Sequence, residues 1–280
     1  YPPDMMGSLA YVGGMSVEQV LNIEGVDGTV VGEELERIGY RGSAPCPGAI
    51  PHAYVELHIE QGPVLDQAGL QIGVVEGVQG ISWTELVITG QSNHAGTTPM
   101  TLRRDSMVVA GQVTVAARAI ALELGGSQVA TVGSLTLHPN LVNVVPAHTT
   151  MTVDLRNTDE KSLQVAEEQL RQRTAELAEA EGVEVNSRTL ARFEPVEFDD
   201  RVVDQIEHLA TRRGLSTKRM PSGAGHDAQM MARVCPTGMI FVPSVGGVSH
   251  NPAEHTDEQD LIAGAQLLAD TLLALTEVNW

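Results

Sequence analysis

The chain has 280 residues, of which 42% are hydrophobic, so it can bury the core of one or two domains. Its 17 basic and 36 acidic residues give a net charge of −19, which disfavours nucleic acid and anionic membranes as partners. The two cysteines, Cys46 and Cys235, lie outside any CxxC spacing, and no apolar run reaches the roughly 20 residues of a membrane span, so we expect a cytoplasmic protein.

The opening Tyr1-Pro2-Pro3-Asp4 is typical of the middle of a loop, and we therefore expect a piece of a longer protein.

The first segment with a clear strand pattern carries a histidine near its end. Residues 53–59 alternate apolar and polar side chains, which predicts a strand that Gln61-Gly62-Pro63 ends. Ligands bind at the carboxyl ends of strands in open α/β sheets, so the position of His58 at this end makes it a candidate site residue.

Residues 81–196 follow a different pattern, in the order strand, helix, strand, strand, helix, strand. The segments are a strand over 83–89, a helix over 105–124, strands over 129–137 and 143–156, a helix from an N-cap at Thr158 to Gly182, and a strand over 183–193. The strand over 143–156 is expected to bend at Pro146. This order predicts a ferredoxin-like α+β domain of helices on an antiparallel sheet.

After the insert, helices and strands alternate again. We expect helices over 202–213, 227–234 and 260–275, the last preceded by a capping box at Thr256-Asp257-Glu258-Gln259, and a short buried strand over 239–243. The fold class is therefore α/β. Residues 1–80 and 197–280 would form a discontinuous main domain, into which residues 81–196 are inserted.

Four histidine-containing phrases stand out in this framework. They are Glu56-Leu57-His58-Ile59-Glu60-Gln61-Gly62-Pro63, Ser92-Asn93-His94-Ala95-Gly96-Thr97-Thr98-Pro99-Met100, Gly223-Ala224-Gly225-His226-Asp227 and Ser249-His250-Asn251-Pro252-Ala253-Glu254. Together they resemble the N-carbamoyl-L-amino acid hydrolase and allantoate amidohydrolase family of dinuclear metallo-amidohydrolases. The resemblance covers essentially the whole chain, and it implies a zinc-peptidase-like catalytic domain with an inserted lid and dimerisation domain.

The resemblance implies a centre of two divalent metal ions, either zinc or manganese, cobalt or nickel. It assigns His58 and His250 as metal ligands. On chemistry alone Glu254 or His255 could also bind zinc, but the motif selects His250. Glu60 is expected to orient its neighbours rather than to bind metal.

The resemblance assigns substrate contacts to Gln61, Gly225 and His226, where backbone N–H groups at a helix start meet a carbonyl or an anion. Asp227 would fix the ring of His226 or cap the helix. His94 would polarise the scissile carbonyl as the catalytic electrophile, reaching the site on domain closure or from a partner subunit.

Asn143 and Arg156 complete the substrate-binding residues that the resemblance assigns. Arg156 would grip the substrate carboxylate, because a guanidinium pairs with both carboxylate oxygens. Each assignment has a plainer alternative: a strand histidine with a satisfied hydrogen bond, a loop histidine, a flexible helix entry, or, for Arg156, a surface ion pair of little energy.

The family pattern also requires an upstream histidine, a bridging aspartate and a Glu-Glu pair that supplies the general base. We expect these before Tyr1, because Glu33-Glu34 and Glu167-Glu168 both lie in helix-like contexts. The chain would then hold two of the metal ligands and one wall of the substrate site, and this truncated chain by itself is expected to be inactive.

The implied reaction is hydrolysis of N-carbamoyl-L-amino acids, with allantoate as the alternative substrate. An aminopeptidase or aminoacylase of the wider superfamily shares the fold, although its motifs differ. A third alternative is a catalytically inactive dimerising fragment. The expected partners are a small ureido or amide carboxylate and a second copy bound through residues 81–196, where the helix over 105–124 is apolar around much of its circumference.

Overall fold

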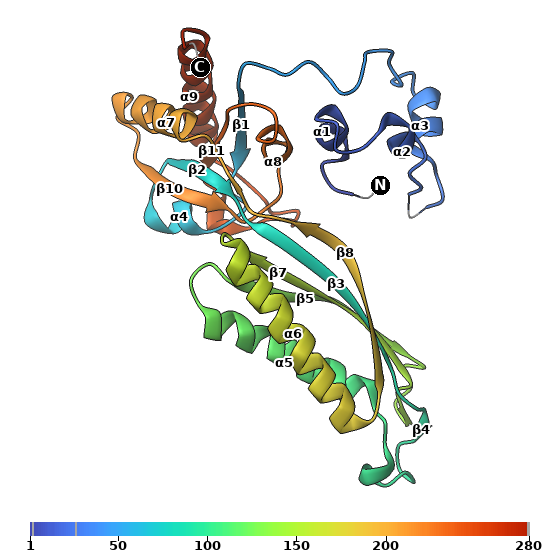
Figure 1. The fold of residues 1–280 in the computed structure, drawn as a ribbon. Coiled ribbons are helices and arrows are strands. Elements are labelled where there is room, and N and C mark those ends of the chain that lie inside the picture. Colours follow the sequence, from blue (N-terminus) through green and yellow to red (C-terminus); the bar gives the residue numbers. More distant parts are fainter. Residues whose placement is uncertain (2, 26, 279–280) are drawn as a thin grey trace. The chain divides into compact units, whose positions relative to one another are not determined.

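The computed structural model describes residues 1, 3–25 and 27–278. It divides the chain into two compact units, which are shown in Figure 1. Unit 1 consists of Tyr1–Val78 and Val196–Trp280, and unit 2 consists of Gln79–Pro195. The insert predicted at 81–196 differs from unit 2 by one or two residues at each end. The assignment of metal binding to the outer segments, and of lid and dimerisation functions to the insert, stays a prediction.

Unit 1 is built on a mixed β-sheet. Its helices are α1 (Met6–Tyr11), α2 (Val17–Leu21), α3 (Val31–Arg37), α4 (Val64–Ala68), α7 (Asp200–Arg212), α8 (Asp227–Met231) and α9 (Glu258–Thr276). Its strands are β1 (Tyr54–Ile59), β2 (Ile72–Val78), β9 (Val196–Glu197), β10 (Thr217–Ser222) and β11 (Thr237–Val242). The sheet order is β1-β11-β2-β10, with β9 paired to β2. β1 is parallel to β11 and β10 is parallel to β2, whereas β11 and β2 are antiparallel.

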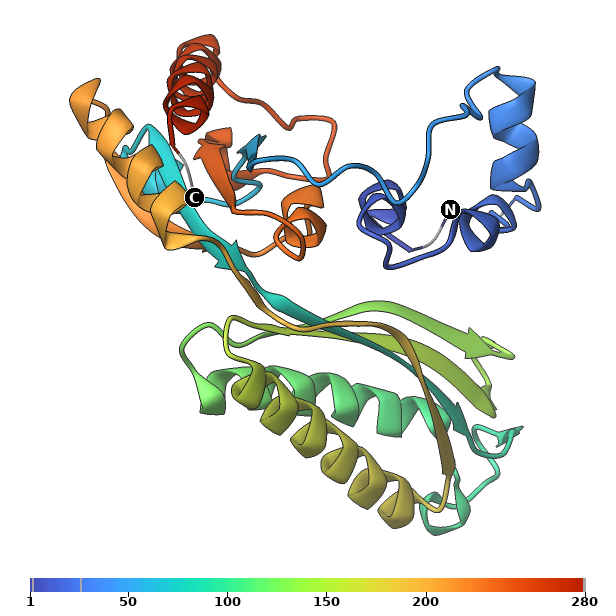
Figure 2. The same ribbon diagram turned by 45° about the horizontal axis from the view of Figure 1, so that its top comes forward.

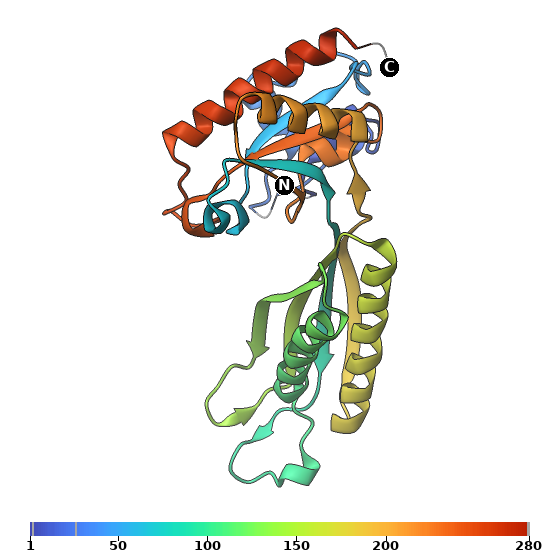
Figure 3. The same ribbon diagram turned by 90° about the vertical axis from the view of Figure 1, so that its left-hand side faces the viewer.

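Helices α7 and α9 lie side by side against this sheet, as Figure 3 shows. α9 contacts β1 and β11, while α7 contacts β2 and β11. Every residue of β11 is buried. Gly264 lets α9 approach closely, because a Cβ atom at this position would lie 2.6 Å from Cγ1 of Val242. This packing fixes the two parallel strands whose carboxyl ends carry the candidate site.

Unit 2 combines a four-stranded antiparallel sheet with two long helices. Its elements are β3 (Gly80–Thr89), β4 (Asn93–His94), α5 (Ser106–Leu124), β5 (Val129–His138), β6 (Val144–Val145), β7 (His148–Asn157), α6 (Glu160–Glu181) and β8 (Glu184–Phe193). The sheet order is β5-β7-β3-β8, and β4 and β6 form a separate pair. The single bent strand predicted over 143–156 is therefore two strands, β6 and β7, which Pro146 separates.

Figure 2 shows α5 and α6 side by side on one face of the sheet of unit 2. β7 turns its buried residues, among them Met151, Val153 and Leu155, toward these helices. α5 has the length and hydropathy of a membrane span, but its buried residues pack into this core, as do those of core helices in soluble proteins. The opposite face of the sheet carries the side chains of Trp83, Asp154 and Arg156.

Candidate functional site

The parallel pairing of β1 with β11 joins segments of the chain that are far apart in sequence. His58 lies opposite Phe241, and the N–H of Glu60 donates to the carbonyl of Val242 at 2.9 Å. Directly after the two strands, the N–H of Gln61 donates to Oγ of Ser244 at 3.0 Å. Because parallel strands end at the same edge of a sheet, the loop after β1 meets the loop that leads to His250.

The ring of His58 is oriented as in a metal-binding histidine. Its Nδ1 lies 2.8 Å from the carbonyl oxygen of Ile59, which can only accept a hydrogen bond, so Nδ1 carries the proton. In the neutral ring Nε2 is then the atom with a lone pair. Metal-binding histidines usually make this second hydrogen bond, which fixes the tautomer. The ring is half-buried.

His250 lies in an exposed loop with a constrained backbone. It has a φ of 54°, in the left-handed region that non-glycine residues rarely adopt, and Gln61 has a φ of 56°. The N–H of His250 donates to the carboxylate of Glu254 at 3.2 Å. A hydrogen bond from Ser249, together with the nearby rings of His250 and His58, holds the pKa of Glu254 below its ordinary value. The amide of Gln61 donates to Ser249 at 3.2 Å, which links the two loops.

The donor atoms fit one part of a metal centre. His58 presents a correctly oriented imidazole, and His250 lies in the adjoining loop. In the described part of the chain no group of three His, Cys, Asp or Glu side chains is placed to hold an ion. Glu60 instead accepts hydrogen bonds from the N–H groups of Val64 and Leu65, each at 2.7 Å, and so caps the N-terminus of α4. Its expected orienting function toward the metal ligands stays a prediction.

His226 lies against His58, with the two ring centroids 4.7 Å apart in an edge-on arrangement. Its side chain is almost fully buried, and Nε2 lies 2.8 Å from Oγ of Ser222. Its Nδ1 lies 3.5 Å from Oε1 of Glu56. The structure therefore brings His226, which follows Gly225, beside the candidate metal ligand. Their contacts to substrate stay predictions.

Glu56 is a residue of this site that the sequence analysis did not single out. It accepts hydrogen bonds from the N–H of Ala228 at 2.8 Å and from the hydroxyl of Tyr54 at 3.2 Å. Burial raises the pKa of Glu56, but hydrogen bonds from His226, Ala228 and Tyr54 outweigh burial, and the pKa lies below its ordinary value. It is Glu56, rather than the exposed Asp227, that faces the ring of His226. The signal was present in the sequence, because Glu56 and His58 share one face of an alternating strand.

In unit 2 the structure brings His94 and Asn143 together. β4 pairs with β6, and the N–H of Ala95 donates to the carbonyl of Asn143 at 2.9 Å. Nδ1 of His94 accepts from the N–H groups of Gly96 at 3.0 Å and Thr97 at 3.3 Å. The proton of the neutral ring therefore resides on Nε2, which makes this exposed side chain a hydrogen-bond donor, as a carbonyl-polarising group must be.

Arg156 lies near the carboxyl end of β7, whereas the segment with His94 lies near the amino end of this strand. Asp154 and Trp83 contact the guanidinium of Arg156. Its Nε lies 3.1 and 3.0 Å from the two carboxylate oxygens of Asp154, and its Nη2 lies 2.8 Å from Oδ2. The guanidinium stands 6.0 Å from the ring centroid of Trp83. The strand from His148 to Arg156 spans about 26 Å at 3.3 Å per residue, so the structure does not bring Arg156 to His94 within one copy of the chain.

Known proteins share this fold. The chain matches peptidase family M20/M25/M40 over residues 7–274. It is 35% identical to the N-carbamoyl-L-amino-acid amidohydrolase of Rhizobium meliloti over 99% of the chain and 67% of that relative. It is 37% identical to the allantoate amidohydrolase of Escherichia coli K12 over 100% of the chain and 68% of that protein. A crystal structure of a Burkholderia multivorans amidase of the hydantoinase/carbamoylase family superimposes with a TM-score of 0.90 at 41% identity, over 98% of this chain and 67% of that one. The chain thus spans about two thirds of the length of these proteins.

Proposed function

Because the chain belongs to peptidase family M20/M25/M40 and the two relatives compared above are named as amidohydrolases, we propose that it serves the metal-dependent hydrolysis of N-carbamoyl-L-amino acids. The bond broken would be the ureido C–N bond, with release of the amino acid, ammonia and carbon dioxide. Members of the family generally use a dinuclear metal centre. The metal itself, zinc or manganese, cobalt or nickel, is part of this proposal.

One observation carries the proposal: the carboxyl end of β1 joins four of the residues assigned to the site. His58 contacts His226 through its ring, and Gln61 contacts Ser249 beside His250. A histidine with only a structural role would not need a tautomer that a backbone carbonyl fixes, as it does for His58. It would also not need to lie beside a second loop in which His250 has a left-handed backbone conformation.

When bound, the metal ions would lower the pKa of a water molecule and polarise the substrate carbonyl. His58 and His250 are the residues of this chain that would hold them. Gln61 and the N–H of Gly225 would orient the ureido group beside them, while His226 keeps the ring of His58 in place. Glu56 anchors this arrangement, because its carboxylate fixes both His226 and the first turn of α8.

Two residues of unit 2 would act on the charged parts of the substrate. Nε2–H of His94 would donate to the oxygen that becomes negative as the carbonyl is attacked. Arg156, oriented by Asp154, would bind the substrate carboxylate. A small ureido acid is far shorter than the length of β7, so it could not contact His94 and Arg156 of the same copy.

This separation supports a homodimer in which the second copy supplies His94. A substrate held by Arg156 of one chain would be polarised by His94 and contacted by Asn143 of the other. α5 offers a surface for such pairing, because Val108, Val115 and Leu122 are exposed at intervals of seven residues. Loss of the dimer would then remove His94 from the reaction without any change at the metal ligands.

Allantoate is the second candidate substrate, because the Escherichia coli relative is named for it and the reaction chemistry is the same. Both substrates combine a ureido group with a carboxylate, and Arg156 suits either one. The alternative of another class is a catalytically inactive, dimerising fragment. The two classes differ in metal content and in turnover.

An assay of ammonia release tests the proposal. The 280-residue chain would be compared with the same chain fused to the segment of the Rhizobium meliloti relative that it does not match, each with added zinc, manganese or cobalt. The substrates would be N-carbamoyl-L-amino acids with small and large side chains, and allantoate. We expect the fused protein to hydrolyse N-carbamoyl-L-amino acids in a metal-dependent way. A fused protein that is folded and metal-loaded but hydrolyses neither class of substrate would contradict the proposal.

A further inference from the structure

A cavity of about 360 Å³ lies within unit 2, between α6 and the strands β3 and β8. We call it the α6–β8 cavity. It is lined by Ser82, Thr84 and Leu86 of β3, Leu155 of β7, Glu167, Leu170, Arg171, Thr174 and Ala175 of α6, and Val185, Ser187, Thr189 and Arg192 of β8. The volume falls within the range of small-molecule sites.

The cavity exists because short hydroxyl side chains occupy positions that ordinarily carry apolar ones. Residues at alternate positions of β3 and β8 face α6, and an apolar side chain at each would fill the space beneath the helix. Here β3 places Ser82 and Thr84 on this face, and β8 places Ser187 and Thr189 there. The register between the strands shifts at Leu190, and such a bulge bends a strand.

The hydroxyl groups around the cavity have no hydrogen-bond partner in the described part of the chain. Ser82 is only 4% exposed, whereas Ser187 and Thr189 of the edge strand β8 are exposed. A hydroxyl without a protein partner is free to donate to and to accept from a ligand. Leu86, Leu155 and Leu170 provide an apolar floor beside these polar groups.

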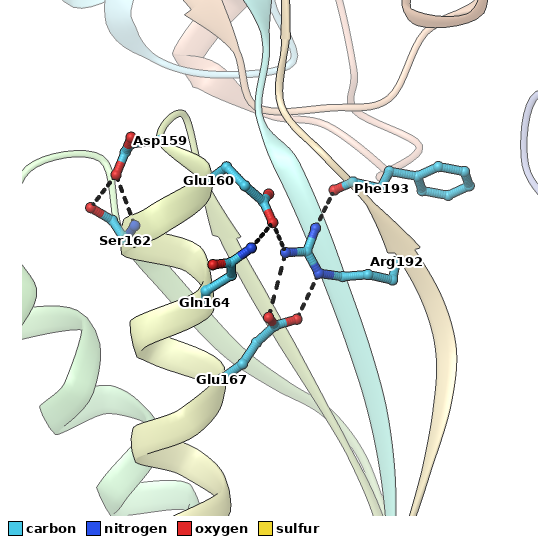
Figure 4. Close-up of polar contacts among 7 residues, drawn as sticks. All are labelled: Asp159, Glu160, Ser162, Gln164, Glu167, Arg192 and Phe193. Atoms are coloured by element: carbon cyan, nitrogen blue, oxygen red, sulfur yellow. Dashed lines mark hydrogen bonds and ion pairs between the residues drawn. The ribbon is translucent and has the colours of Figure 1, made fainter.

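The charged residues at the cavity largely neutralise one another. Figure 4 shows Arg192 between two carboxylates of α6: its Nη2 lies 2.5 Å from Glu160, and its Nε lies 2.7 Å from Glu167. Arg171 is paired with Glu168 at 2.5 Å. Each of the two arginines that line the cavity is therefore already paired with a carboxylate, and neither is left free to bind an anion.

We propose that the α6–β8 cavity binds a small uncharged polyhydroxyl compound of the carbohydrate class. Serine and threonine hydroxyls both donate and accept, which matches the hydroxyl groups of such a compound, and the leucine floor would contact its C–H face. The ligand would connect α6 to β3 and β8 and so stabilise unit 2. The site is distinct in chemistry from the hydrolytic site, whose substrate is a carboxylate.

Isothermal titration of the 280-residue chain with D-glucose, myo-inositol and glycerol tests this proposal, with N-carbamoyl-L-alanine as the anionic comparison. We expect at least one neutral probe to bind, and the anion to bind more weakly at this site. Ser82→Ala combined with Thr84→Val removes two hydroxyls and retains shape. Each lost hydrogen bond should weaken the neutral probe roughly 2- to 12-fold.

Thr136→Val is the matched control, because Thr136 is an exposed strand residue of β5 that does not line the cavity. It should leave the affinity for the probe unchanged. The thermal midpoint of the double variant should not fall, because each removed hydroxyl lacks a protein partner. The proposal is wrong if no neutral probe binds at millimolar concentration, if the control weakens binding as much as the double variant does, or if the double variant binds normally.

Discussion

Arg156 is the residue whose surroundings most directly indicate carboxylate binding. Asp154 fixes one edge of the guanidinium, and Trp83 supports its face. We predict that Arg156→Lys impairs the active protein mainly through substrate binding, because an ammonium offers a point charge in place of a planar fork. The expected loss is about 1.5–3 kcal/mol, or a rise of KM of roughly 10- to 150-fold.

Steady-state kinetics on N-carbamoyl-L-amino acids would measure this change. Arg188→Lys is a suitable control, because Arg188 is an exposed arginine that pairs with Glu85 on the same sheet. Its KM should equal that of the parent protein. An unchanged KM for Arg156→Lys would remove Arg156 from the substrate site.

Glu56 should matter for stability as well as for site geometry. Its half-buried carboxylate bridges β1 and α8 through Tyr54, His226 and Ala228. We predict that Glu56→Gln lowers the free energy of unfolding by about 1–3 kcal/mol, because a neutral amide replaces a charged acceptor that several donors share. Urea unfolding of the 280-residue chain would measure the change.

The matched control is Glu76→Gln, since Glu76 is exposed and lies 3.7 Å from Arg219. An exposed pair contributes between roughly 0 and 1 kcal/mol, so its unfolding midpoint should hardly move. Equal midpoints for the two variants would show that the contacts of Glu56 contribute no more to stability than a surface pair.

The sequence identified site residues that lie close together, but it did not predict the contacts that orient their side chains. The phrases around His58, Gln61 and His226 identified residues that the structure does bring together. The alternation placed Glu56 on the strand face of His58, but its partners His226 and Ala228 lie about 170 positions away, so only the folded structure shows what Glu56 contacts. Asp227 was considered as a partner of the His226 ring because of its proximity in sequence, but the structure gives that place to Glu56.

At the scale of the element, the lengths of the long helices and the C-cap at Gly182 were predictable, whereas two predicted N-caps were not. α5, α6 and α9 begin and end within two residues of their predicted bounds. The predicted N-cap at Thr158 is wrong, because Asp159 accepts from the N–H of Ser162 at 2.8 Å. The predicted capping box at Thr256 is also wrong, because this hydroxyl donates to the carbonyl of Pro243 instead. In both cases a polar side chain had two available partners, and the tertiary fold selected between them.

The exposed stripe on α5 is the element that should form the dimer. Val108, Val115 and Leu122 are 40%, 69% and 72% exposed, and together they form an apolar surface that water disfavours. We predict that Val115→Lys combined with Leu122→Lys converts a dimer into a folded monomer. Light scattering at micromolar concentration would give the mass, and circular dichroism would show that the fold is retained.

Val165→Lys is the matched control, because Val165 is 45% exposed on the neighbouring helix α6. This variant should remain a dimer. A parent protein that is monomeric at micromolar concentration would contradict the prediction and would leave His94 without a route to the Arg156 site of a second copy.

At the scale of the whole molecule, the change from α/β to α+β patterning located the insert, but the order of strands in unit 1 could not be read from the sequence. β2 and β10 carry no strong alternation, and β2 is buried on both faces. β2 also pairs antiparallel with β11 and parallel with β10, a combination that depends on long-range packing. Sequence periodicity does not determine the partner of a fully buried strand.

The number of metal ligands that the fold brings together predicts how much metal the 280-residue chain binds. Catalytic zinc usually takes three protein ligands and a water molecule, whereas the described residues supply the imidazoles of His58 and His250 without a third grouped ligand. We therefore expect the chain to bind zinc, manganese or cobalt weakly, and to release no measurable ammonia from N-carbamoyl-L-amino acids.

Elemental analysis after dialysis measures this directly. We expect far fewer than two ions per chain, and His58→Ala should remove most of the residual binding, because Nε2 of His58 is the best-oriented donor. His52→Ala is the control, since His52 is exposed and outside the site. Close to two tightly held ions per chain would overturn the prediction. Such a result would mean that further side chains, with Asp227, Glu254 and His255 as the first candidates, move in to complete the centre when metal is present, and that two imidazoles at the carboxyl end of β1 are enough to organise them.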